Sequence, residues 1–169
     1  MKNILYLHGY GGSANGSTVK MLKRVFPDCS ISSIEMNFKN PDKLLKDYFE
    51  AGVFDYIVAS SFGAFFAGMV QGNGKKILIN PALPYDICRL DGTYNPEKAL
   101  ELMKKNYSYK DGELAEETYF IFGTEDEIVN NREFYEKLFN KKNMFEFEMG
   151  HKLTEKCATT LIKDLIEEK

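Results

Sequence analysis

Short apolar runs alternate with amphipathic helical stretches from one end of the chain to the other, and this alternation limits the possible folds more than any other feature. The runs at 54–59 and 76–80 are mostly apolar, which is typical of strands buried on both faces. Strands that alternate with helices form parallel sheets, with helices packed on both faces. The pattern therefore predicts an α/β fold with three layers.

The segment 81–117 interrupts this alternation. It contains three prolines, four tyrosines and one convincing helical stretch, at 96–106. Loops of this length in compact domains are usually lids or binding loops. We therefore expect a single domain over residues 1–169, in which 81–117 is a lid or substrate-binding segment. Strands are expected at 3–7, 31–34, 54–59, 76–80, 118–122 and 144–147, and further helices at 17–26, from 41 onward, at 61–70, around 134–139 and at 153–166.

The composition argues against several classes of function. With 169 residues, of which 44% are hydrophobic, the chain can form one ordinary core without metals or disulfides. The net charge of −3, with no block of like charges, argues against nucleic acid or an anionic membrane as a partner. Three cysteines without a CxxC pair and only two histidines predict no metal site, and we expect no cofactor. No apolar stretch is long enough for a membrane span or a signal peptide, so a cytoplasmic protein is expected, with no indication of its oligomeric state.

The most informative motif is Ala59-Ser60-Ser61-Phe62-Gly63, at the junction of a predicted strand and a predicted helix. A serine flanked two residues away by small residues at such a junction is typical of a nucleophile elbow, in which Ser61 Oγ stands exposed above the sheet and Gly63 allows close packing. The same string is also compatible with a serine that merely caps the helix.

A nucleophilic serine needs a base and an orienting carboxylate, which in this arrangement follow it along the chain in the order acid, then histidine. Asp126 comes directly after the strand expected at 118–122, and His151 directly after the strand expected at 144–147. The carboxyl ends of parallel strands meet at one edge of the sheet, where Ser61 also emerges. We expect Ser61, Asp126 and His151 to be catalytic, with Glu125 or Glu127 as alternatives to Asp126.

His8 opens a glycine-rich turn after the first strand, and this turn could bind either a phosphate or an oxyanion. Its spacing gives neither GxGxxG nor a P-loop, which disfavours nucleotide binding. An oxyanion hole formed by the backbone N–H groups of Tyr10 and Phe62 is therefore expected, with Gly9 supplying flexibility. His8 precedes the serine in the chain, so we expect it to support the loop by hydrogen bonding.

These residues together resemble the small bacterial YqiA-like esterases of the α/β-hydrolase superfamily. The resemblance runs from about Leu5 to the last helix and is carried by His8-Gly9, the Ser61 elbow, Leu78-Ile79-Asn80-Pro81-Ala82, Gly123-Thr124-Glu125-Asp126-Glu127 and Gly150-His151. It implies a six-stranded sheet of order 2-1-3-4-5-6, a minimal form of the fold, and hydrolysis of short acyl esters or thioesters.

The sequence thus predicts a serine hydrolase that acts on small acyl esters or thioesters through an acyl-enzyme on Ser61. Two alternatives stay open, an acyltransferase with the same triad and a binding protein that keeps the fold without turnover. Tyr85, Tyr94 and Tyr107 in the segment 81–117 either line the substrate pocket or pack that segment onto the domain.

Overall fold

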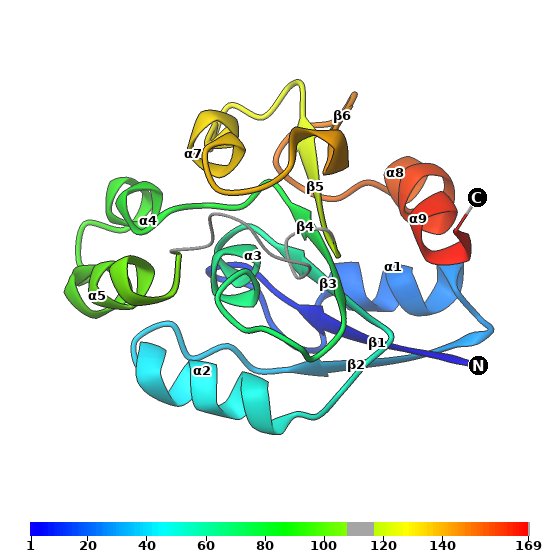
Figure 1. The fold of residues 1–169 in the computed structure, drawn as a ribbon, viewed down its shortest axis with the longest axis horizontal. Helices are drawn as coiled ribbons and strands as arrows, with labels where there is room; N and C mark the ends of the chain where they lie inside the picture. The colour runs from blue at the N-terminus through cyan, green and yellow to red at the C-terminus, as the bar shows by residue number, and fades with distance from the viewer. Residues whose placement is uncertain (108–116, 169) are drawn as a thin grey trace.

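The computed structural model describes residues 1–107 and 117–168, which form one six-stranded parallel sheet with helices on both faces (Figure 1). The strand order is β2-β1-β3-β4-β5-β6, so the predicted topology is confirmed. The strands are β1 (Lys2–Leu7), β2 (Cys29–Ile34), β3 (Tyr56–Ser60), β4 (Lys75–Ile79), β5 (Thr118–Gly123) and β6 (Met144–Phe147).

The strands run in the same direction, and their register aligns their carboxyl ends. Leu7 of β1 pairs with Ala59 of β3, Ser60 of β3 pairs with Ile79 of β4, and Gly123 of β5 pairs with Phe147 of β6. The loops that follow these strands therefore gather at one edge of the sheet, which is where open α/β sheets bind their ligands.

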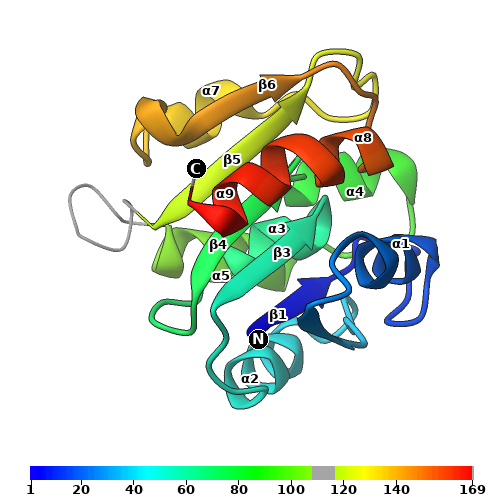
Figure 2. The same ribbon diagram turned by 90° about the vertical axis from the view of Figure 1, so that its right-hand side faces the viewer.

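The helices form a layer on each side of the sheet. Figure 2 shows α1 and the C-terminal helix in front of the sheet, with α3 and α5 behind it. The helices are α1 (Ser17–Val25), α2 (Pro41–Glu50), α3 (Phe62–Ala67), α4 (Pro84–Leu90), α5 (Glu97–Asn106), α7 (Arg132–Glu136), the 3₁₀ turn η1 (Lys141–Asn143), and a C-terminal helix formed by α8 (Glu155–Cys157), the π-helical η2 (Ala158–Ile162) and α9 (Lys163–Glu167). No helix in the described part of the chain is long and apolar enough to cross a membrane.

The sheet separates two hydrophobic clusters because side chains alternate between its faces. On one face, Ile57 and Leu78 pack with the aromatic side chains of α3. On the other face, Ile77 and Ile121 pack with the apolar stripes of α1 and the C-terminal helix. Strands β3, β4 and β5 are therefore buried on both sides, which explains why their sequences are almost continuously apolar.

The segment 81–117 extends the helical layer, and its described residues add no strand to the sheet. It contains the expected helix α5 and also α4, which the sequence analysis missed. Helix α4 has only seven residues, too few to show a helical period, and it begins with Pro84 while the Asp86 carboxylate accepts a hydrogen bond from the Leu83 N–H at 2.8 Å. Part of the predicted lid segment, residues 108–116, lies outside the described residues.

Candidate active site

Ser61 occupies the sharp turn between β3 and α3. Its backbone angles, φ 54° and ψ −121°, are strained for a residue with a side chain. The turn is held from the next strand, because the Ser61 N–H donates to the Ile79 carbonyl at 2.9 Å and the Ala82 N–H donates to the Ser61 carbonyl at 3.1 Å. This geometry matches the predicted elbow.

Two glycines make room for the turn. A β-carbon on Gly63 would overlap the carbonyl oxygen of His8, and a β-carbon on Gly9 would lie 2.9 Å from Ser61 Cβ. The start of α3 and the loop after β1 can therefore approach each other closely only with glycine at both positions. This contact brings the glycine-rich loop beside Ser61.

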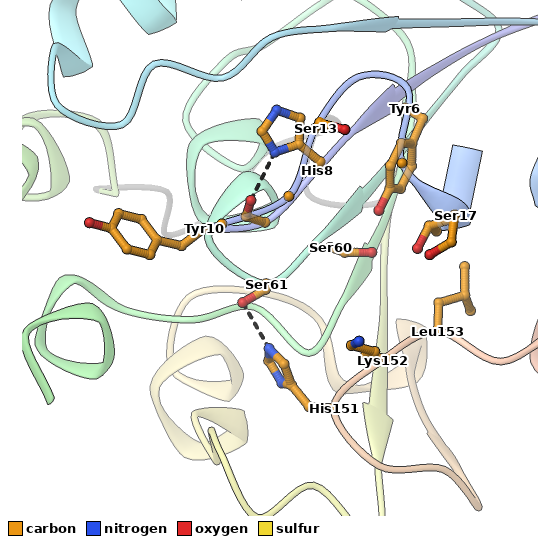
Figure 3. A pocket seen from close by; sticks show the side chains of 15 residues that line it. Tyr6, His8, Tyr10, Ser13, Ser17, Ser60, Ser61, His151, Lys152 and Leu153 are labelled. Atoms are coloured by element: carbon orange, nitrogen blue, oxygen red, sulfur yellow. Dashed lines mark hydrogen bonds between the residues drawn. The ribbon is translucent and has the colours of Figure 1, made fainter. Parts of the chain in front are cut away.

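The structure brings Ser61, His151 and Asp126 together in a chain of hydrogen bonds. His151 Nε2 lies 2.9 Å from Ser61 Oγ, and His151 Nδ1 lies 2.8 Å from Asp126 Oδ2 (Figure 3). A carboxylate accepts hydrogen bonds, so Nδ1 carries the ring proton and Nε2 is left to accept one from the serine hydroxyl. The histidine is thus oriented as a base toward Ser61.

Asp126 is fixed by its own loop. Its Oδ1 accepts hydrogen bonds from the backbone N–H groups of Ile128 at 2.8 Å and Val129 at 3.0 Å, and its side chain is 2% exposed. Glu125 and Glu127, the alternatives considered from sequence, are both exposed. Of the three acids, Asp126 is the one that contacts the histidine.

The two expected oxyanion donors flank Ser61. Phe62 is the first residue of α3, where a helix offers no internal acceptor for the backbone N–H, and Tyr10 follows Gly9 in the adjacent loop. Within residues 1–107 and 117–168, neither N–H has a hydrogen-bond acceptor. Both groups are therefore free to bind a negatively charged oxygen.

The Tyr10 side chain anchors the loop to the segment after β4. Its hydroxyl donates to Asp91 Oδ2 at 2.6 Å, and its ring contacts Phe38, Phe62 and Tyr94. Hydrogen bonds from Thr93 and from Tyr10 lower the pKa of Asp91 to about 2, and the bond to Asp91 raises the pKa of Tyr10. The loop that carries the Tyr10 N–H is thus held by an anion.

His8 lies under the same loop, 5% exposed. The Met36 N–H donates to His8 Nε2 at 3.0 Å, so Nδ1 carries the proton and donates to the Gly9 carbonyl at 2.8 Å. Both ring nitrogens are used to connect the loop with the segment after β2. His151, by contrast, directs Nε2 toward Ser61.

Sequence reasoning missed the role of Asn80, which follows β4. Its side-chain Nδ2 donates to the carbonyls of Gly150 at 3.0 Å and His151 at 2.9 Å, and its Oδ1 accepts from the Gly123 N–H at 2.7 Å. The residue is 2% exposed and has a positive φ of 44°. The one available signal was an asparagine before Pro81 at a strand end, since asparagine tolerates this conformation better than most residues.

A cleft of about 410 Å³ opens beside Ser61 (Figure 3). It is lined by Tyr6, the loop at 8–13, the start of α1 at 16–18, Ser60, Ser61 and the segment 151–153. The cleft lies on the α1 side of Ser61 and not against α4 or α5.

The predicted pocket tyrosines lie elsewhere. Tyr85 is 62% exposed, whereas Tyr94 and Tyr107 are buried in the cluster around α3, and none of the three lines the cleft. The Tyr107 hydroxyl donates to the carbonyl of Phe65, and the Tyr94 ring contacts Phe62 edge-on. The expectation that they line the pocket is corrected, because aromatic packing onto α3 uses two of them to fix the segment 81–107 to the domain.

No group of three or more His, Cys, Asp or Glu side chains with the arrangement of a metal site occurs among residues 1–107 and 117–168. The three cysteines are free, and burial raises the pKa of the Cys157 thiol to about 12.

No protein-family model and no curated protein sequence matches the chain. Solved structures do. Est1E from Butyrivibrio proteoclasticus matches with a TM-score of 0.67 at 14% identity, over 99% of this chain and 87% of that chain. Alpha/beta hydrolase domain-containing protein 10 from mouse matches with a TM-score of 0.63 at 14% identity, over 98% and 90% of the two chains. MGS-MChE2, an alpha/beta hydrolase enzyme from a lagoon-sediment metagenome, gives 0.62 at 14% identity, over 99% and 89%. The chain therefore has the α/β-hydrolase fold.

Proposed function

We propose that the protein is a serine hydrolase that cleaves small carboxylic esters or thioesters through an acyl-enzyme on Ser61. The observation that carries this proposal is the chain of hydrogen bonds from Ser61 Oγ through the His151 ring to Asp126, at 2.9 and 2.8 Å. A serine hydroxyl alone is a weak nucleophile, and an adjacent oriented base activates it.

In the acylation step, Ser61 Oγ attacks the acyl carbon while its proton passes to His151 Nε2. The imidazolium that forms is stabilised by the ionised Asp126. The carbonyl oxygen becomes an oxyanion, which the N–H groups of Tyr10 and Phe62 bind. The bond between the acyl carbon and the leaving group then breaks, and His151 returns the proton to the leaving oxygen or sulfur, so the products are an acyl-enzyme and a free alcohol or thiol.

In the deacylation step, water takes the place of the leaving group. His151 removes a proton from the water, the resulting hydroxide attacks the acyl carbon, and the same two N–H groups bind the second oxyanion. The proton on Nε2 then passes to Ser61 Oγ as the ester bond to the enzyme breaks. The acid is released and Ser61 and His151 are regenerated.

The oxyanion donors contribute a large share of the barrier reduction. One such donor is worth roughly 3 kcal/mol in a well-studied serine protease. A preorganised donor is effective because it needs no rearrangement during the reaction. Here the Tyr10 loop is held by Asp91, by His8 and by the close contact of Gly9 with Ser61.

The substrate class rests on the cleft and on the related folds. A cleft of about 410 Å³ suits a small substrate. Est1E has also been solved with a small carboxylic acid, ferulic acid, bound. The resemblance to the YqiA-like esterases supports the same class of reaction.

Labelling with a fluorophosphonate tests the proposal. This probe phosphonylates an activated serine, so the wild type should be labelled at Ser61, as mapped by mass spectrometry of the peptide. Ser61→Ala should give no label while keeping the wild-type circular dichroism spectrum and melting temperature. Absence of label on folded wild-type protein would favour the binding protein, and label without release of acid from simple esters would favour acyl transfer to another acceptor.

A further inference from the structure

The side chains that line the cleft beside Ser61 include one cation, Lys152. Besides the backbone of the glycine-rich loop, its lining offers the hydroxyl groups of Tyr6, Ser17, Thr18 and Ser60, and the ammonium group of Lys152. Neither aspartate nor glutamate is among the residues that line it. Beside the apolar surface of Tyr6, Tyr10 and Leu153, the cleft thus offers hydroxyl groups and one full positive charge to a polar part of a substrate.

Lys152 is available to a ligand. Its side chain is exposed, and in the described ranges of the chain its ammonium group forms no ion pair. Its backbone is held close to the catalytic centre, because the carbonyl of the preceding His151 accepts the hydrogen bond from Asn80. An unpaired lysine that lines a cleft next to the catalytic histidine can bind an anion without first breaking another contact.

The opposite wall of the cleft is the start of α1. The N-cap of this nine-residue helix is Gly16, no side chain caps it, and its first turn contains no acidic residue. Ser17 and Thr18 line the cleft there. The partial positive charge of the helix N-terminus therefore adds to the charge of Lys152 across the cleft.

The floor between these walls carries buried hydroxyl groups. The Tyr6 side chain, 3% exposed, faces the side chain of Ser60 (Figure 3). Burial raises the pKa of Tyr6, and its contacts with the hydroxyl groups of Ser60 and Thr18 offset part of this rise. Ser60 Oγ is buried without a hydrogen bond of good geometry. The floor thus places the hydroxyl groups of three residues close together.

The direction of proton transfer places the leaving group in this part of the cleft. His151 Nε2 must return its proton to the leaving oxygen, so that oxygen lies on the His151 side of Ser61 Oγ. On that side the cleft continues past His151 to Lys152 and Leu153 (Figure 3). The acyl carbonyl oxygen points the other way, toward the N–H groups of Tyr10 and Phe62.

We propose that the preferred substrate is an ester whose alcohol portion carries a negatively charged group, bound between Lys152 and the start of α1. This inference rests on the proposed hydrolase function and adds a substrate class to it. Both partners of the anion, Lys152 and the Ser17–Thr18 corner, lie outside the triad and the oxyanion hole.

Matched esters test this inference. For each ester, kcat/KM is divided by the rate constant of its hydrolysis by hydroxide, which corrects for intrinsic reactivity. The normalised value for 4-acetoxybenzoate should be about tenfold higher than that for 4-acetoxybenzamide, because a charge-assisted hydrogen bond exceeds a neutral one by about this factor. Lys152→Gln should reduce the ratio to near one, and Lys152→Glu should reverse it. Lys156→Gln, which removes an exposed lysine outside the cleft, should leave the ratio unchanged. The wild-type ratio should also fall with added salt.

Two further measurements separate the possible failures. Equal normalised rates for the two esters, or a preference that Lys152→Gln leaves intact, would overturn the inference while the hydrolase function stands. In monophenyl succinate the charged group lies on the acyl portion, and the phenyl ester of succinamic acid is its neutral counterpart. If Lys152 causes a preference for monophenyl succinate but none for 4-acetoxybenzoate, the anion binds on the acyl side and the inference is overturned. Binding of 4-hydroxybenzoate in preference to 4-hydroxybenzamide, measured by NMR titration of wild type and Lys152→Gln, needs no turnover and supports the anion site even if neither ester is hydrolysed.

Discussion

The side chain of Asn80 holds the main chain of His151, because Asn80 Nδ2 donates a hydrogen bond to the His151 carbonyl at 2.9 Å. The same amide group accepts a hydrogen bond from the Gly123 N–H at 2.7 Å, at the start of the loop that carries Asp126. One buried side chain at the end of β4 therefore connects the loop of the proposed acid with the loop of the proposed base. We infer that Asn80 is a positioning residue for this pair.

Replacing Asn80 should lower kcat much more than it changes KM. Asn80→Asp keeps the acceptor for Gly123 but places a carboxylate against two carbonyls, and Asn80→Ala leaves all three backbone groups unpaired. A displacement of the histidine by about 1 Å is enough to reduce the rate roughly 100-fold. Steady-state kinetics on a neutral ester checks this.

Asn73→Ala is the matched control for Asn80. Asn73 is 4% exposed, precedes β4 at its opposite end and accepts a hydrogen bond from the Tyr48 hydroxyl at 3.2 Å. Its loss should lower the melting temperature but leave kcat of the folded protein unchanged. If Asn80→Asp behaves in the same way, Asn80 contributes to stability alone.

The strands could be predicted from sequence because buried parallel strands are almost continuously apolar and are bounded by turns. The ends of the helices were harder to predict. Helix α3 ends at Ala67, with Gly68 as its C-cap, although the apolar pattern continues to Val70. Helix α4 depends on a local cap and a proline, and its seven residues are too few for a period to appear.

The positions of Ser61, Asp126 and His151 could be predicted because each follows a strand directly, and parallel strands end at one edge. The role of Asn80 could not, because it depends on two loops more than 40 residues away in sequence. The choice between the two roles left open for Tyr94 and Tyr107 has a similar cause. A tyrosine in a segment outside the sheet can face a cleft or a core, and the choice depends on where α3 presents its aromatic face.

The two histidines should differ sharply when replaced. His151→Ala should lower kcat by a factor on the order of 10⁴ or more, since it removes the proposed base. His8→Ala removes the acceptor of the buried Met36 N–H, and should lower the free energy of unfolding by about 1–3 kcal/mol with a much smaller effect on kcat. Parallel kinetics and urea denaturation distinguish the two, and the opposite ranking would reassign the base to His8.

The acids of the loop after β5 should also differ. Asp126→Asn should reduce kcat by a factor on the order of 10³–10⁴, because an amide no longer fixes the proton on His151 Nδ1. Glu125→Gln and Glu127→Gln change exposed side chains and should stay within about twofold of wild type. Equal losses for all three variants, measured as kcat on one ester, would contradict the assignment of Asp126.

The close packing at the elbow predicts a strong effect of one methyl group. Gly63→Ala forces a β-carbon into the carbonyl oxygen of His8, so we expect a loss of about 1–3 kcal/mol in the free energy of unfolding and a fall in activity, as the loop and Ser61 are pushed apart. Gly92→Ala is the control, because a β-carbon there meets no atom within 4 Å. Thermal unfolding of both variants measures the difference, and equal melting temperatures would contradict the packing described for the elbow.

The buried Lys76 predicts a pH dependence of stability that is independent of catalysis. Lys76 is 6% exposed in β4, and burial lowers its pKa to about 8, against about 10.5 in the unfolded chain. At pH 7 the amine is charged in both states, so folding buries a charge, and Lys76→Met should raise the free energy of unfolding by a value on the order of 3 kcal/mol. Between pH 8 and 10.5 the unfolded chain binds more protons than the folded one, so the wild type gains stability and the advantage of Lys76→Met shrinks.

Lys75→Met is the control for Lys76→Met. It removes a lysine paired with Glu168 at 2.6 Å and should give no such gain in stability. Thermal unfolding of the three proteins at pH 7 and 10.5 checks this, and an advantage of Lys76→Met that is equal at both pH values would show that packing, and not the charge, is responsible.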